Sequence, residues 1–182
     1  KTVNILKTIK ADITTVADVQ AIVNAANSEL LGCFNPNHLC IDNTIHTYAG
    51  IQLRLECNDI MKAQGHSEPI GKAKITSAYN LPSKYIIHTV GPMIFNKVMK
   101  KDCDALESCY RSCLSLADEY DVNSIAFCCI STGEFKFPNN VAAELAVRSV
   151  KRYKQETGSK IKVIFNVFRE NDNQIYKKLL EE

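Results

Sequence analysis

The chain has 182 residues, of which 46% are hydrophobic and 23% are charged, and its formal net charge is +2. A chain of this size can bury a full hydrophobic core, so we expect one domain over 1–182. The near-neutral charge, without a cluster of Lys and Arg, argues against nucleic-acid binding. No apolar run approaches the roughly 18 residues of a membrane-spanning helix, so no membrane span is expected.

Two further features concern the compartment and the start of the chain. The eight cysteines fall mostly inside periodic segments, which favours a reducing cytoplasm over a disulfide framework. The first residue is Lys1 and not Met, which is typical of a chain with a trimmed N-terminus. We therefore expect a cytoplasmic protein that lacks an N-terminal extension in this sequence.

The hydrophobic pattern alternates between strands and helices. In chain order it predicts strands over 3–9 and 21–23, a helix over 43–63, strands over 74–78 and 85–90, a helix over 102–120, a strand over 125–130, a helix over 140–157, a strand over 163–168 and a helix over 173–180. Asp42 is suited to cap the start of the first helix. Continuous apolar strands between amphipathic helices indicate an α/β fold with a mixed or mostly parallel sheet covered on both faces.

A candidate metal site follows the second strand. Cys33, His38 and Cys40 lie within eight residues, in a stretch that Asn and Pro residues mark as a loop. Two thiolates and one imidazole suit zinc, and three protein ligands leave a position for water or substrate. The alternative is a partly buried pair of cysteines with an unrelated histidine nearby. A fourth ligand such as Cys57 would close the site and make it structural.

A second candidate loop, residues 131–138, follows the strand predicted over 125–130. Ser131, Thr132 and Gly133 can present hydroxyls and backbone N–H groups to a phosphate, and Gly133 permits close approach of the backbone. Taken alone, this stretch can also be a simple turn. Both candidate loops lead from a strand into a helix, where ligands bind in sheets of this type.

Five segments in order carry a resemblance to a known family. They are Lys-Ala-Asp-Ile-Thr at 10–14, Asn-Ala-Ala-Asn at 24–27, Ile45-His46 with Ala49-Gly50, Tyr-Ile-Ile-His-Thr-Val-Gly-Pro at 85–92, and the loop at 131–138. Together they resemble the macrodomain family of ADP-ribose-binding modules. The resemblance spans nearly the whole chain. It implies a single macrodomain over 1–182 with a three-layer α/β/α fold, whose central mixed, largely parallel sheet is flanked by helices.

A narrower resemblance lies in the metal-ligand loop. Gly32-Cys33-Phe34, Pro36, His38, Cys40 and Ile-Asp-Asn at 41–43 are similar to the zinc-dependent branch of the family, whose members hydrolyse mono-ADP-ribose off proteins. Most macrodomains have a run of glycines at this place. Here metal-ligand residues largely replace the glycines, and Asp42 keeps the acidic position. The resemblance therefore implies a zinc-dependent protein-ADP-ribose hydrolase.

The resemblance also implies roles for individual residues. Asp12 would accept a hydrogen bond from the adenine amino group, with the Ile13 backbone amide beside it. Phe168 would pack on adenine, and Asn27 would hold the distal ribose. The residues around the diphosphate and that ribose would be Ser131, Thr132, Gly133, Glu134 and Phe135. Asp12, Asn27 and Phe168 can each have a purely structural role instead. Asp12 can cap a turn, Asn27 can favour the geometry of its own turn, and Phe168 can belong to the core.

The chemistry requires an activated water or ribose hydroxyl. A zinc ion held by the three ligands beside the distal ribose can polarise such an oxygen. Two thiolates temper that effect, so a nearby base is expected, and we assign Asp42 to catalysis together with Asn27. Asp42 can instead serve only as a helix cap, and His46 and His88 are competing bases.

Two other functions compete with the hydrolase. One is a non-catalytic reader that binds ADP-ribose and carries a structural zinc. The other is an RNA-binding or scaffolding use of the same site. For the hydrolase, family precedent implies ADP-ribose and a mono-ADP-ribosylated protein as partners, commonly a lipoyl-carrier protein modified by a sirtuin-like ADP-ribosyltransferase.

Overall fold

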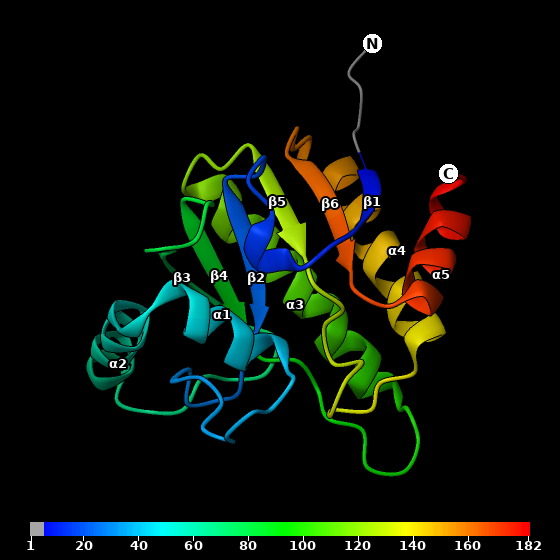
Figure 1. Ribbon diagram of the computed structural model, residues 1–182. Helices are drawn as coiled ribbons and strands as arrows, with labels where there is room; N and C mark the ends of the chain where they lie inside the picture. Colours follow the sequence, from blue (N-terminus) through cyan, green and yellow to red (C-terminus); the bar gives the residue numbers. More distant parts are fainter. Residues whose placement is uncertain (1–5) are drawn as a thin grey trace.

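The computed structural model of the protein describes residues 6–182, which form a six-stranded sheet flanked by five α-helices (Figure 1). The strands are β1 (Leu6–Lys10), β2 (Ala21–Ala25), β3 (Ala73–Ser77), β4 (Tyr85–Thr89), β5 (Ser124–Phe127) and β6 (Lys162–Val167). The helices are the short 3-10 helix η1 (Ile13–Thr15), α1 (Ile41–Ala49), α2 (Ile51–Gln64), α3 (Lys100–Glu119), α4 (Asn139–Thr157) and α5 (Glu170–Leu180). The predicted three-layer α/β/α fold is confirmed.

The sheet is mixed and largely parallel, as predicted. Its strand order is β1-β6-β5-β2-β4-β3, and each neighbouring pair is parallel except β3 with β4. The central strand β2 is buried at its first four positions, whereas the edge strands β1 and β3 are mostly half-buried. A parallel strand that is covered on both faces needs a continuous apolar run, which explains Ala21, Ile22 and Val23; the fourth buried residue, Asn24, is polar.

The helices cover both faces of the sheet. In Figure 1, α1 and α2 lie on one side of it, and α3, α4 and α5 lie on the other. An aromatic cluster joins α3 and α5 to the second face: Tyr110 contacts Phe127 with ring centroids 4.9 Å apart, and Tyr176 stacks on Phe165 at 5.0 Å. Such pairs add about 0.5–1.5 kcal/mol each beyond the burial of their surface.

The helix predicted over 43–63 is two helices in the structure. α1 ends at Ala49 and α2 begins at Ile51, and Gly50 between them has a φ of 98°. Side chains rarely tolerate this backbone conformation, so a glycine lets the chain turn here. The apolar stripe hid the break because Ala49 before it and Leu53 after it are both fully buried.

Other boundaries differ by a few residues. The strand predicted over 3–9 begins outside the described residues, and β1 is its described part. β5 stops at Phe127 although the apolar run continues to Ile130, because those residues pack in the core without pairing to a neighbouring strand. α5 begins at Glu170, earlier than predicted, and its first turn is acidic, which suits the positive end of a helix dipole.

The parallel strands determine where a site can form. The carboxyl ends of β1, β2, β4, β5 and β6 lie at one edge of the sheet. Both candidate loops, residues 26–40 after β2 and residues 128–138 after β5, start at this edge. Within residues 6–182, none of the helices combines the length and apolar character needed to span a membrane.

Candidate functional site

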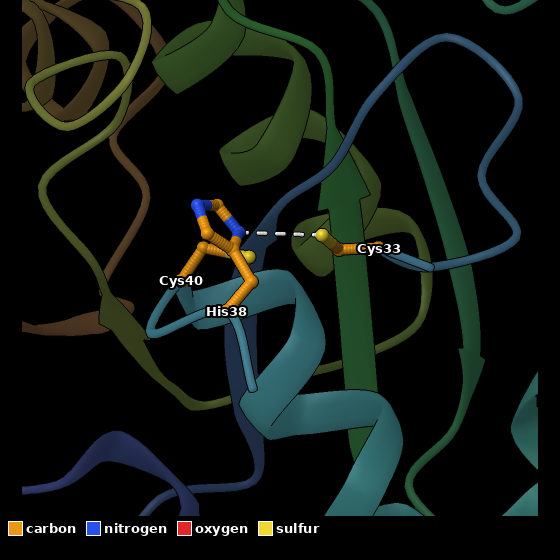
Figure 2. A group of neighbouring side chains, drawn as sticks. All are labelled: Cys33, His38 and Cys40. Atoms are coloured by element: carbon orange, nitrogen blue, oxygen red, sulfur yellow. Dashed lines mark hydrogen bonds between the residues drawn. The ribbon is translucent and has the colours of Figure 1, made fainter. Parts of the chain in front are cut away.

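Cys33, His38 and Cys40 come together in the loop between β2 and α1. Their ligand atoms all lie within 4.8 Å of one another, and Cys33 Sγ is 3.3 Å from His38 Nδ1. Figure 2 shows His38 Nδ1 directed at the sulfur of Cys33, with the sulfur of Cys40 on the same side of the imidazole ring. All three residues are half-buried. The predicted grouping of these three side chains is therefore present.

Local hydrogen bonds hold both cysteines in place. Cys40 is the N-cap of α1, and its Sγ accepts a hydrogen bond of 3.4 Å from the Asn43 backbone amide. The Asn43 side chain donates to the carbonyl oxygen of Cys33 at 3.1 Å. Asn43, in the first turn of α1, thus contacts the Cys40 thiol directly and holds Cys33 through its backbone carbonyl.

The protonation of the two thiols fits a cation between them. Burial acts to raise the pKa of Cys33, but hydrogen bonds from the Asn35 backbone and His38 outweigh it and hold that pKa below its usual value. Burial raises the pKa of Cys40 to about 11. One thiol is therefore poised to ionise while its neighbour resists, and a bound cation would allow both to be thiolates. The donor set fits zinc.

Cys57 does not complete this cluster. It lies on α2 in a separate buried group with His46 and His88. Both nitrogens of His88 already have partners, Asn24 Nδ2 at 3.2 Å and Thr76 Oγ1 at 2.9 Å. His88 is thus a hydrogen-bonded part of the core, whereas both ring nitrogens of His46 have no hydrogen-bond partner among the described residues. Because Cys57 groups with these histidines, it does not supply the fourth ligand that would close the site of Cys33, His38 and Cys40.

Asp42 is a buried carboxylate that follows the metal loop, as we call residues 32–40, which contain Cys33, His38 and Cys40. The expectation that Asp42 caps α1 is wrong. The cap is Cys40, and the Asp42 side chain turns inward, where its Oδ1 accepts a hydrogen bond of 2.8 Å from Asn24 Nδ2. The same amide nitrogen donates to His88 Nδ1. His88 must then carry its proton on Nε2, which donates to Thr76. Four buried side chains from α1, β2, β4 and β3 form one chain of hydrogen bonds.

Burial controls the ionisation of this group. Burial raises the pKa of Asp42 to about 6, although the hydrogen bond from Asn24 and the charge of Arg54 oppose it. Burial lowers the pKa of His88 to about 3, and burial with the charge of Arg54 lowers that of His46 to about 4. At neutral pH both histidines are uncharged. Asp42 is then the anionic group of the cluster and a better candidate base than either histidine.

These two histidines predict a loss of stability in acid. The unfolded histidines take up protons near pH 6.5, whereas His88 and His46 resist protonation until about pH 3 and 4. The unfolded state therefore binds more protons, and each histidine should cost about 1.36 kcal/mol per unit below pH 6.5. The raised pKa of Asp42 opposes this loss below about pH 6. We expect the unfolding free energy of the His88→Gln protein, measured in urea at pH 7 and pH 5, to change less between these two pH values than that of the unmodified protein. An equal change in both proteins would contradict the lowered pKa of His88.

The candidate adenine residues come from two neighbouring strands. Asp12 follows β1 and Phe168 follows β6, and these strands are paired, with Lys10 opposite Val167. Phe168 is 75% exposed, so the alternative that it belongs to the core is wrong. Asp12 does cap η1, because its Oδ1 accepts from the amide and hydroxyl of Thr14 at 2.9 and 2.6 Å. That leaves Oδ2 available to a ligand.

Asn27 shapes the first loop. Its Nδ2 donates to the carbonyl oxygen of Gly32 at 3.1 Å, and its Oδ1 accepts from the amide of Glu29 at 3.1 Å. The alternative role in turn geometry is therefore present. Because Asn27 fixes the residue that precedes Cys33, it also positions the metal loop.

The second loop has a closed backbone with two strained residues. The Phe137 amide donates to the Ser131 carbonyl at 2.9 Å, and Ser131 and Lys136 have φ angles of 66° and 60°. Strained conformations of this kind cluster at ligand sites. Gly133 is exposed with open space around it, and the backbone carbonyl of Phe135 accepts from Ile94 at 2.8 Å. Thr132 bonds the Cys129 carbonyl through its hydroxyl at 3.1 Å. Glu134 Oε1 is 2.6 Å from His38 Nε2, so the two loops touch.

Sequence reasoning missed three residues that support the site. Asn24 and Thr76 belong to the Asp42 network, and Asn24 could have been noticed as the first residue of the 24–27 motif. Arg54 on α2 donates from Nε to the Leu31 carbonyl at 2.9 Å and lies over the Phe34 ring at 4.8 Å. It therefore braces the metal loop. No local pattern marks Arg54 or Thr76, because their contacts are made in the folded chain.

A surface hollow elsewhere does not compete with this site. It measures about 890 Å³ and lies on α4 beside Leu179. Arg152 and Glu156 in its lining pair with each other at 2.8 Å. The hollow lies on the exposed face of one helix, away from both candidate loops.

Comparison with known proteins gives the family. The Macro domain family model matches residues 23–146. A protein-ADP-ribose hydrolase of Staphylococcus aureus (strain MSSA476) is 59% identical over 169 residues, which are 92% of this chain and 63% of the relative. The protein of the same name from Treponema medium is 56% identical over 171 residues, 94% of this chain and 65% of the relative. The chain thus spans somewhat less than two thirds of the length of these curated relatives.

Solved structures agree. The Oceanobacillus iheyensis macrodomain with ADP has a TM-score of 0.84 and 35% identity, over 96% of this chain and 88% of that one. The Trypanosoma brucei macrodomain in complex with ADP-ribose has a TM-score of 0.80 and 33% identity, over 96% of this chain and 68% of that one. The family model covers more than half of the sequence and the folds coincide. The chain therefore belongs to the macrodomain family.

Proposed function

We propose that this chain is a zinc-dependent hydrolase that removes mono-ADP-ribose from modified proteins. The observation that carries the proposal is that Cys33, His38 and Cys40 converge at the start of α1, two residues before a buried carboxylate, Asp42. The names of the relatives, protein-ADP-ribose hydrolases that are 56–59% identical, support the same activity.

The metal part of the proposal depends on the donor set. Cys33, His38 and Cys40 would hold the ion, and Cys57 is not placed to close the site. Three protein ligands and an open position are typical of catalytic zinc. When bound, the ion would supply Lewis acidity toward an oxygen of water or of the substrate.

Asp42 is the proton acceptor in this proposal. Asn24 occupies its Oδ1, which leaves Oδ2 to take the proton of the attacking water or hydroxyl. The His88 and Thr76 side chains prevent the Asn24 amide from rotating, so they act as positioning residues. Because this network is buried, the Asp42 carboxylate is already fixed in one orientation. It therefore needs no reorganisation during the reaction.

We propose that ADP-ribose lies along the edge formed by the carboxyl ends of the strands. Asp12 Oδ2 and the Ile13 amide would bind the adenine amino group and ring, and exposed Phe168 would stack on adenine. The diphosphate and distal ribose would lie between Asn27 and the loop residues Ser131, Thr132, Gly133, Glu134 and Phe135. The ADP-ribose bound by the Trypanosoma brucei macrodomain supports this ligand class.

An expected result tests the adenine contact. Asp12→Asn keeps an oxygen that can accept from Thr14, so η1 stays capped, but it can turn an amide donor toward the adenine amino group. We expect affinity for ADP-ribose to fall by about 1–3 kcal/mol, the cost of losing a hydrogen bond to a charged group. Calorimetry measures the affinity, and a thermal melt checks the fold. An unchanged affinity would place adenine elsewhere.

The activity is tested with proteins that carry mono-ADP-ribose through a defined linkage, with and without a chelator. A lipoyl-carrier protein modified by a sirtuin-like transferase belongs in this panel. Release that depends on the metal supports the hydrolase. Binding of ADP-ribose without release on any linkage, with zinc present, would make the protein a reader.

A further inference from the structure

One contact joins the two loops of the site. His38 Nε2, in the loop before α1, lies 2.6 Å from Glu134 Oε1, although the two residues are 96 positions apart. The other nitrogen of the same ring, Nδ1, lies 3.3 Å from Cys33 Sγ. The imidazole therefore stands between a carboxylate and the candidate metal ligands.

This geometry decides which nitrogen can bind a metal. An ionised carboxylate only accepts hydrogen bonds, so the nitrogen that faces Glu134 carries the proton. The lone pair of Nδ1 can then face the two cysteines. Metal-binding histidines usually donate their second N–H to a carboxylate, a carbonyl or water, and this partner fixes the tautomer and the ring orientation.

The position of Glu134 is otherwise difficult to explain. It belongs to the loop that we propose surrounds the diphosphate, and a free carboxylate there would repel an anionic ligand. Its side chain is 69% exposed, so packing does not orient it. The contact with His38 gives the carboxylate a direction and a partner.

We propose that Glu134 is a positioning residue for the metal site, which holds His38 in the tautomer that presents Nδ1 to the ion. The inference rests on the zinc part of the proposed function. It adds a residue from the second loop to the metal site. The loop around the diphosphate and the loop around the metal are then parts of one unit.

The first test measures zinc affinity by competition with a chromogenic chelator. We expect Glu134→Ala to bind zinc about 10- to 100-fold more weakly than the unmodified protein, the usual loss for such partners. Glu134→Gln should lie between the two, because its amide oxygen can still accept from Nε2. The matched control is Glu156→Gln, which removes an exposed carboxylate that pairs with Arg111 and Arg152 on the helical surface.

The second test reads the tautomer directly. Long-range proton–nitrogen NMR of the zinc-loaded protein should show Nε2 protonated and Nδ1 bound to the metal. Because Glu134 is exposed, the Ala variant should fold, and a thermal melt verifies this. Zinc on Nε2, or equal zinc affinity in the unmodified protein and Glu134→Ala, would overturn the inference alone. An unmodified protein that binds no zinc would overturn the inference and the zinc-dependent function together. Weakened zinc binding in the variant without hydrolysis by the unmodified protein would support the positioning role and overturn the hydrolase.

Discussion

Replacing Cys40 with Ala is expected to slow the release of ADP-ribose from a modified protein by about a hundredfold or more. A Lewis-acidic metal contributes several kcal/mol to the transition state, and each 1.36 kcal/mol changes a rate by about tenfold. Affinity for free ADP-ribose should change much less, because this contribution acts mainly in the transition state. Single-turnover release and calorimetry measure the two quantities separately.

The metal content of the same proteins completes this experiment. Elemental analysis should find about one zinc per chain in the unmodified protein, since thiolate and imidazole ligands prefer it to magnesium or calcium. The Cys40→Ala protein should have lost it. Cys103→Ala is the control, because it removes another half-buried thiol from a different element. Full activity in a folded, zinc-free protein would overturn the proposed chemistry. Full zinc occupancy after replacement of all three ligands would overturn the site.

The second large effect is expected for Asp42→Asn. The asparagine retains an oxygen that can accept from Asn24, so the buried network survives, but it cannot take up a proton. Loss of a positioned base typically costs about 10²- to 10⁴-fold in rate. Burial raises the pKa of Asp42 to about 6, so the folded state disfavours the charged form that exists at pH 7. The neutral variant should therefore be at least as stable as the original protein.

The unfolding free energy of the Asp42→Asn protein distinguishes a catalytic role of Asp42 from a role as a helix cap. Loss of an N-cap would lower the unfolding free energy by about 1 kcal/mol, whereas we expect no loss. The control is Asp104→Asn, which removes an exposed carboxylate that pairs with Lys100 at 2.7 Å. Unchanged release by Asp42→Asn would exclude this residue as the base. If the loss instead appears in a folded His46→Asn protein, His46, whose Nε2 lies 3.6 Å from Asp42 Oδ1, takes the role.

The sequence predicted the helices and strands that follow from local residue patterns, and the candidate metal ligands that lie close together along the chain. The apolar run of β2 and the helical spacing of α3 are local patterns, and the structure has both elements within a few residues of the predicted bounds. Cys33, His38 and Cys40 lie so close along the chain that any compact loop tends to bring them together. Local patterns failed at Gly50, where one apolar stripe runs across two helices, and at Asp42, which lies two residues after the N-cap of α1.

By itself the sequence determined the order of strands and helices, the family resemblance and the three metal-ligand candidates, because each is written in contiguous residues. Only the tertiary structure decided the environment of the site. In the folded chain, Asn24 contacts Asp42, and His88 and Thr76 extend the same chain of hydrogen bonds. Glu134 contacts His38, and Cys57 lies in a different group of side chains from the three ligand candidates. The physical reason is that burial and hydrogen bonding between distant residues arise when the strands assemble side by side. The pKa of Asp42 follows from that assembly, since burial is its largest cause.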